Sequence, residues 1–97
     1  MKETFYRIPE EVQVMKFIDT DESIIEAFEW INNEDTSGDE KERRDILSFI
    51  RNHKEIEYFA ENGVNKVPFK HYIVKDSNGK ISSYSEKEFN KLFTKKL

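Results

Sequence analysis

The last third of the chain constrains the fold most, because it encodes a β-hairpin followed directly by a capped helix. Two segments of strand-like composition, 71–75 and 80–84, flank Asn78-Gly79, and an Asn-Gly pair favours the tight type I′ turn of a hairpin. Ser85 and Glu88 then have the spacing of a capping box, in which each side chain accepts a hydrogen bond from the other residue's backbone amide. This region therefore predicts two antiparallel strands and a terminal helix.

The composition is that of a single, strongly charged domain. Of the 97 residues 37% are charged, but eight Phe, four Tyr and one Trp supply the large apolar side chains that disordered chains lack. A chain of this length has a small core, because folding removes only a modest share of its surface from water. Without cysteine it can form neither a disulfide framework nor a thiolate metal site. We expect one domain, 1–97.

Charge and hydropathy limit the partners. No apolar segment resembles a signal peptide, and none approaches the roughly 18 residues of a membrane-spanning helix, which predicts a cytoplasmic protein with no membrane partner. The net charge of −4 makes direct nucleic-acid binding unlikely on electrostatic grounds, since phosphate binding needs concentrated Lys and Arg. Residues 1–42 hold 13 acids and four bases, whereas residues 43–97 hold seven acids and 12 bases, so we expect a bipolar molecule.

The first third predicts an arm, a strand and a helix. Residues 1–11 are expected to form an N-terminal arm, because Pro9 interrupts regular structure. Residues 11–18 have apolar side chains at both odd and even positions, which indicates a central strand covered on both faces. Asp19 and Glu22 have capping spacing and predict the start of a helix that ends near residue 33.

The middle of the chain contains one element that can be either a helix or a strand. An acidic loop is expected over 34–39, and Asp39 can cap a helix over 39–52. The apolar run in 46–51 also fits a strand, because short apolar runs do not distinguish the two periods. A second Asn-Gly pair, Asn62-Gly63, predicts another hairpin.

Together these elements predict an α+β fold. We expect a small antiparallel sheet of four to five strands, packed against two or three helices that include the capped C-terminal helix. One face of the sheet should bear the first and the last helix. Unpaired sheet edges would also make a homodimer possible.

Several short motifs occur in the order found in one class of small proteins. They are Val12-Gln13-Val14-Met15-Lys16-Phe17, Glu61-Asn62-Gly63, Tyr72-Ile73-Val74-Lys75, Asn78-Gly79-Lys80-Ile81 and Glu88-Phe89. Over roughly half its length the chain resembles small, mostly uncharacterised phage and prophage proteins with the pattern T-L-E-G, G-D-Y-I-I-K, G-E-F-Y and a final helix containing Phe. Two segments depart from that pattern. Lys70-His71 replaces Gly-Asp, and Ser82-Ser83-Tyr84 replaces Phe-Tyr-Pro.

The resemblance implies a phage or mobile-element origin. In that setting small acidic proteins often block a host enzyme or a defence system, in the cytoplasm of the host cell. The resemblance offers no catalytic residues for this chain.

An acidic surface is the leading candidate site. The stretch from Asp19 to Glu42 contains ten acids and one base, and it can either attract a basic surface of another protein or serve only as a solvated helix face and loop. Trp30 lies off the apolar stripe of its helix, so it is either a lid over the sheet edge or an exposed anchor. The candidate residues are Asp21, Glu22, Glu26, Glu29, Trp30, Glu34 and Asp35.

The second hairpin offers an alternative ligand site. Tyrosines beside lysines can stack on and neutralise a nucleotide, although cross-strand packing explains the same residues. The candidates are Lys70, His71, Tyr72, Lys75, Lys80 and Tyr84.

No catalytic or metal-binding motif is present in the sequence. Phosphate loops and catalytic-triad motifs are missing, the segment 19–22 lacks the later ligands of a calcium loop, and His53 and His71 are isolated in sequence. We therefore expect no enzyme, no cofactor and no metal. The leading hypothesis is a phage accessory protein that binds and inhibits a host or defence protein with a basic surface. The alternatives are a protein that sequesters a nucleotide signal and a virion structural or assembly protein.

Overall fold

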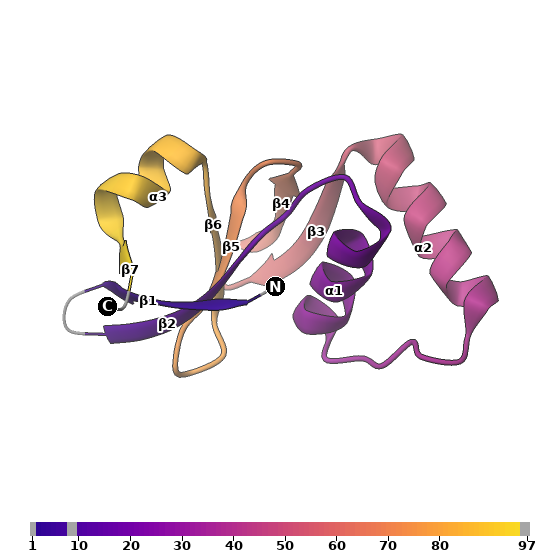
Figure 1. Ribbon diagram of the computed structural model, residues 1–97, viewed down its shortest axis with the longest axis horizontal. Coiled ribbons are helices and arrows are strands. Elements are labelled where there is room, and N and C mark those ends of the chain that lie inside the picture. Colours follow the sequence, from indigo (N-terminus) through magenta and orange to yellow (C-terminus); the bar gives the residue numbers. More distant parts are fainter. Residues whose placement is uncertain (1, 8–9, 96–97) are drawn as a thin grey trace.

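A five-stranded antiparallel sheet forms one half of the molecule, and helices and a separate hairpin are arranged around it (Figure 1). The structure is a computed structural model that describes residues 2–7 and 10–95. The sheet has the strand order β6-β5-β2-β1-β7, and β3 pairs with β4 in a second sheet. The strands are β1 (Glu3–Arg7), β2 (Glu10–Lys16), β3 (Glu55–Ala60), β4 (Gly63–Pro68), β5 (Tyr72–Lys75), β6 (Ile81–Tyr84) and β7 (Thr94–Lys95). The helices are α1 (Asp21–Asn32), α2 (Glu40–His53) and α3 (Glu86–Leu92).

The predicted α+β class is confirmed, and so is the central place of β2. This strand lies between β1 and β5. Its apolar residues Val12, Val14 and Met15 are each 1% exposed, and Phe17 just beyond it is fully buried. Because successive strand residues point to opposite faces, both faces of β2 must be covered.

The two faces of the sheet have separate cores, and this corrects one expectation. On one face Phe89 and Phe93 pack on Val12, Val14 and Val74. On the other face the core is larger, and it joins the sheet to α1, α2 and the β3–β4 hairpin. The first and last helices therefore lie on opposite faces, because β2 is apolar on both sides. This arrangement gives an elongated molecule of 41 × 25 × 24 Å with α3 near one end and α2 at the other (Figure 1).

The N-terminal segment is a strand rather than an arm. Residues of β1 pair with β2 in a register that places Phe5 opposite Val12, and β1 also pairs with β7. Strand β1 ends at Arg7 and β2 begins at Glu10, and Pro9 lies outside the described residues. The prediction of an arm over 1–11 was wrong for its described residues, because 3–7 form a strand that pairs with β2, and β2 itself begins at Glu10.

The predicted helices are confirmed, with one different cap. Helix α1 is capped by Thr20, whose hydroxyl accepts a hydrogen bond from the Ser23 amide, whereas Asp19 forms an ion pair with Arg51 at 2.7 Å. Residues 40–52, for which the sequence allowed either a helix or a strand, belong to helix α2. Asp39 is the N-cap of this helix. The capping box of α3 is also confirmed, since both of its reciprocal hydrogen bonds form.

Both Asn-Gly pairs lie in hairpins, but neither forms the expected turn. A type I′ turn needs positive φ at both central residues. Of each pair only the glycine has a positive φ, +110° at Gly63 and +82° at Gly79. Gly63 lies opposite Ala60, so the turn residues of the β3–β4 hairpin are 61 and 62.

Candidate functional site

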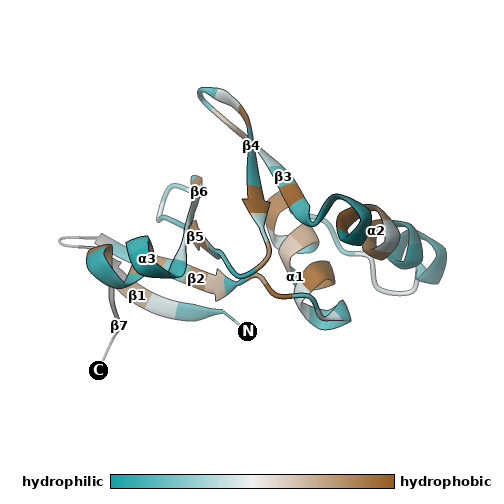
Figure 2. Ribbon diagram, turned by 90° about the horizontal axis from the view of Figure 1, so that it is seen from above, coloured by the Kyte–Doolittle hydropathy of each residue, from teal (hydrophilic) through white to brown (hydrophobic). Residues whose placement is uncertain are grey.

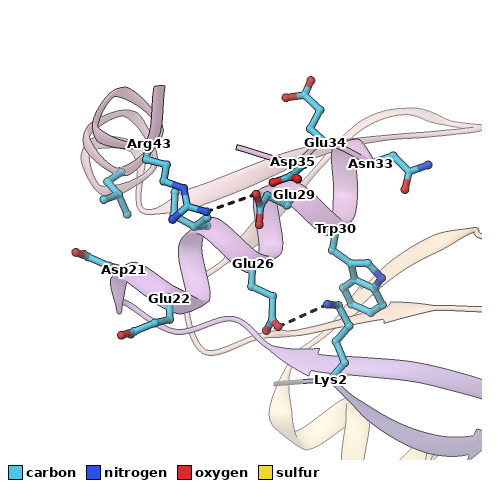
Figure 3. Close-up of a pocket in the computed structure, with 12 residues that line it drawn as sticks. Lys2, Asp21, Glu22, Glu26, Glu29, Trp30, Asn33, Glu34, Asp35 and Arg43 are labelled. Carbon is cyan, nitrogen blue, oxygen red and sulfur yellow. Dashed lines mark ion pairs between the residues drawn. The ribbon is translucent and has the colours of Figure 1, made fainter. Parts of the chain in front are cut away.

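The acidic candidates line one groove beside α1. The groove has a volume of about 790 Å³, and all seven residues predicted from the sequence border it (Figure 3). We call it the acidic groove, and its lining residues are Lys2, Asp21, Glu22, Ile25, Glu26, Glu29, Trp30, Asn33, Glu34, Asp35, Arg43 and Leu47.

Helical spacing brings these side chains together. Glu22, Glu26 and Glu29 are three or four positions apart, so they lie on one face of α1. Asn33 ends the helix in the left-handed conformation, with φ of 58°, and the chain then continues into Glu34 and Asp35. The opposite wall comes from α2, through Arg43 and Leu47.

The groove has an excess of negative charge that its own cations only partly balance. Six carboxylates and two cations line it, a difference of −4. Glu26 pairs with Lys2 at 3.5 Å and Glu29 with Arg43 at 3.8 Å (Figure 3). At its edge Asp21 pairs with Arg51 at 2.7 Å. Three exposed acids of the groove form no ion pair within the described chain, and they are Glu22, Glu34 and Asp35.

Glu29 holds the loop after α1 in place. Its Oε2 atom accepts hydrogen bonds from the Thr36 amide at 2.6 Å and from the Thr36 hydroxyl at 2.9 Å. Thr36 is only 1% exposed, so its amide has no access to water as a substitute acceptor. Arg43 donates to the Thr36 carbonyl as well. The role of Glu29 is therefore structural, and the carboxylate is largely occupied by its own chain.

Trp30 lies under two ammonium groups instead of projecting as an anchor. Its side chain is partly buried against the larger core. The Nζ atoms of Lys2 and Lys75 lie 5.4 and 5.1 Å from the ring centroid, and Lys75 also donates to the Trp30 carbonyl at 2.9 Å. Burial lowers the pKa of Lys75, and the nearby Lys2 ammonium lowers it further. These contacts favour the interpretation of Trp30 as a lid over the sheet.

Local contacts favour the ionised form of two groove carboxylates. Hydrogen bonds from the side chain and backbone amide of Ser37 lower the pKa of Asp35. Partial burial alone would raise the pKa of Glu26, but nearby cations that include Lys2 outweigh it and lower that pKa. Both groups therefore contribute negative charge at neutral pH.

The residues of the alternative ligand site are divided between surfaces. Tyr72 and Tyr84 lie opposite each other, as their places in the two strands suggested. Their rings pack on α3, with Tyr72 stacked on Phe89 at 4.1 Å and Tyr84 against Phe93 at 5.2 Å. Lys75 belongs to the opposite face of the sheet, beside Trp30.

The other candidates of that set do not complete a site either. Lys70 and Lys80 are exposed and His71 is partly buried. A cavity of about 300 Å³ near the hairpin includes Lys80 alone of the six candidates. The structure therefore shows the tyrosines as packing residues and does not bring the set together.

A second groove was not predicted from the sequence. It has a volume of about 450 Å³ and lies on the other side of the α1–α2 pair. We call it the apolar groove, and its lining residues are Phe28, Asn32, Asp45, Ile46, Phe49, Ile50, Glu55, Ile56, Glu57 and Phe59. A signal was present, because Phe59 alternates with Glu55 and Glu57 on the solvent face of a strand.

Two classes of feature are absent from the described part of the chain. Among residues 2–7 and 10–95, no three His, Cys, Asp or Glu side chains are grouped so that they could hold a metal ion. No helix in these ranges is both long and apolar enough to span a membrane.

Comparison of the chain with protein-family models, curated proteins and solved structures gives no match. The functional argument therefore rests on the geometry and charge of the chain itself.

Proposed function

We propose that this chain is a non-enzymatic binding protein whose acidic groove receives a basic surface of another protein. The observation that supports this function is the gathering of six carboxylates and two cations around one concave surface. A charge excess of this kind attracts a basic partner over long range, and salt weakens the attraction. Binding would act by occluding the partner's basic surface.

Within the groove, the unpaired acids are the main candidates for contact. Glu22, Glu34 and Asp35 are exposed and have no ion pair among the described residues, so a partner's Lys or Arg can approach them without displacing a cation of this chain. Glu26 and Glu29 already have partners, and an incoming cation would have to compete with Lys2 or Arg43. Trp30 would add apolar contact at the edge of the groove.

The resemblance to phage accessory proteins extends the proposal to the kind of partner. In that setting the basic surface belongs to a host or defence protein in the host cytoplasm, and its occlusion inhibits that protein. This extension depends on the sequence motifs alone.

A pull-down at two salt concentrations tests the proposal. The tagged full chain is incubated with bacterial lysate, and bound proteins are identified at low and at raised salt. We expect one stoichiometric protein to bind at low salt and to be released at raised salt. The double variant Glu22→Lys/Glu34→Lys should not retain this protein. The matched control is Glu11→Lys/Glu61→Lys, which changes the net charge equally at exposed sites outside the groove.

Two results would contradict this function. One is a partner that the groove variant and the control variant retain equally well. The other is the release of a nucleotide from the purified protein with no protein partner, which would move the function to the second hairpin.

A further inference from the structure

One edge of strand β3 pairs with no other strand of residues 2–7 and 10–95. Within these ranges β3 pairs with β4 alone, in a two-stranded sheet. Outside that pairing, no backbone hydrogen bond within the described chain reaches residues 55–60. In an antiparallel pair, alternate residues direct their amide and carbonyl groups away from the partner strand. The outer edge of β3 is therefore open to another strand.

The apolar groove follows this open edge. Glu55, Ile56 and Glu57 line it in succession, although successive side chains of a strand point to opposite faces. A groove that contacts three consecutive residues must run along the edge, and no residue of β4 lines it. Its other wall is formed by α1 and α2. Figure 2 shows the β3–β4 hairpin projecting from the body of the molecule beside these helices.

The groove has an apolar floor, exposed aromatic rings and an acidic rim. Ile50 and Ile56 are 3% and 4% exposed at its floor, whereas Phe49 and Phe59 are 59% and 86% exposed. Large exposed apolar groups beside a groove are characteristic of interaction sites.

The rim is negatively charged. Asp45 and Glu57 are exposed and form no ion pair within the described chain, whereas Glu55 pairs with Lys66 at 3.2 Å. A partner with cationic side chains on either side of its apolar residues would complement this rim.

We propose that the apolar groove binds an extended basic segment of another protein, which pairs with the open edge of β3 as an added strand. Main-chain hydrogen bonds to β3 hold the segment, and its alternate apolar side chains enter the groove between β3 and α2. Its Lys or Arg side chains face Asp45 and Glu57. This surface lies apart from the acidic groove, and the inference does not depend on the function proposed for that groove.

Charge favours another protein over a second copy of this chain. Edge-to-edge pairing of two β3 strands would place Asp45, Glu55 and Glu57 of both copies at one interface. Like charges held together in an interface oppose association. A basic segment meets the same three carboxylates with the opposite sign.

Peptide selection against the full chain tests the inference. Random 12-residue peptides are displayed and selected on the immobilised protein, and the most enriched peptide is synthesised with a fluorophore for anisotropy titration. We expect alternating apolar residues with at least one Lys or Arg, and saturable binding. Phe49→Ser and Phe59→Ser should each weaken binding about tenfold or more. Leu92→Ser is the matched control, because Leu92 is 51% exposed on α3 and lies outside the groove.

Backbone methylation of the same peptide tests the added strand itself. In an added strand only alternate amides of the peptide donate to β3, and the others face away. N-methylation of one alternate set of amides should therefore abolish binding, and methylation of the other set should leave most of it. Both methylated peptides have the same composition, so each is a control for the other.

Four outcomes would overturn the inference. They are the absence of enriched peptides, enriched peptides that bind Phe59→Ser as tightly as the unaltered protein, equal binding of the two methylated peptides, and a dimer in sedimentation velocity that Phe59→Ser dissociates. The last outcome would show that a second copy occupies the groove.

Discussion

The two grooves flank the same pair of helices, and they differ in how far their side chains find contacts within the chain. In the acidic groove Glu29 binds Thr36 and Arg43, and Glu26 binds Lys2. In the apolar groove Phe49 and Phe59 remain largely exposed. Charged side chains that lie near oppositely charged neighbours in one chain can pair with them, whereas water offers no favourable contact to an exposed ring. We therefore expect stability and binding to be coupled in the acidic groove and largely separate at the rim of the apolar groove.

The largest effect is expected at the floor of the apolar groove. Ile50→Ala removes a side chain that is 3% exposed, and the lost contacts and the cavity should reduce the free energy of unfolding by about 2–5 kcal/mol. Urea denaturation followed by circular dichroism measures this change. Ile18→Ala is the control, because Ile18 is 40% exposed and should have a smaller effect. Equal losses from both variants would show that the floor is not part of the core.

A smaller loss is expected from Glu29→Ala in the acidic groove. The substitution leaves the buried Thr36 amide without its acceptor, which should cost about 1–3 kcal/mol of unfolding free energy. The control is Glu34→Ala, because Glu34 is exposed and accepts none of the hydrogen bonds from Thr36. If the two variants are equally stable, the acidic groove is no more coupled to folding than an ordinary surface.

The Asp35 carboxylate should make the stability of the loop depend on pH. Bonds from Ser37 hold its pKa below the ordinary value of 3.8, so the folded chain binds the proton less readily than the unfolded chain does. The contribution is therefore present above that value and is lost as pH falls through the folded pKa. Asp35→Asn should therefore be less stable than the unaltered protein at neutral pH. In acid, where Asp35 is protonated, the two proteins should be about equally stable.

Urea denaturation of Asp35→Asn and of the unaltered protein, from neutral pH into acid, measures the difference in their unfolding free energies. Glu61→Gln is a matched neutralisation at an exposed turn residue, where the described chain shows no comparable hydrogen bond. A difference between Asp35→Asn and the unaltered protein that stays constant into acid would contradict the proposed cause.

The smallest effect on stability is expected at the rim of the apolar groove. Phe59→Ser removes a ring that is 86% exposed, so the unfolding free energy should change by no more than about 0.5 kcal/mol. The same variant should remain soluble to higher concentration, because less apolar surface is exposed. Denaturation and light scattering measure the two quantities, and a large loss of stability would show that Phe59 packs within the fold.

Many parts of the acidic groove were predictable because they follow from spacing along one helix. Glu22, Glu26 and Glu29 share a face through helical periodicity, and Asp35 follows a few residues later. The structural role of Glu29 was not predictable, because it depends on the position of Thr36 beside α2. The lid position of Trp30 likewise depends on Lys75, which comes 45 residues later in the chain.

The apolar groove could not be located from the sequence for a similar reason. Phe49 and Phe59 lie on different elements, and only the packing of α2 beside β3 makes them borders of one surface. The sequence also does not show that β3 and β4 form a sheet of their own, in which the outer edge of β3 pairs with no strand of the described chain.

The sequence by itself determined several local elements: the capping box of α3, the N-cap Asp39 of α2, the two hairpins that carry Asn-Gly pairs, and the two-sided apolar strand β2. These depend on residues a few positions apart, whose side chains and amides meet whenever the element forms. The tertiary structure decided that β1 joins the sheet, that α1 and α3 cover opposite faces, and that Asp19 pairs with Arg51 instead of capping α1. Such contacts join distant segments, and their free energy depends on how whole elements pack together, which neighbouring residues do not specify.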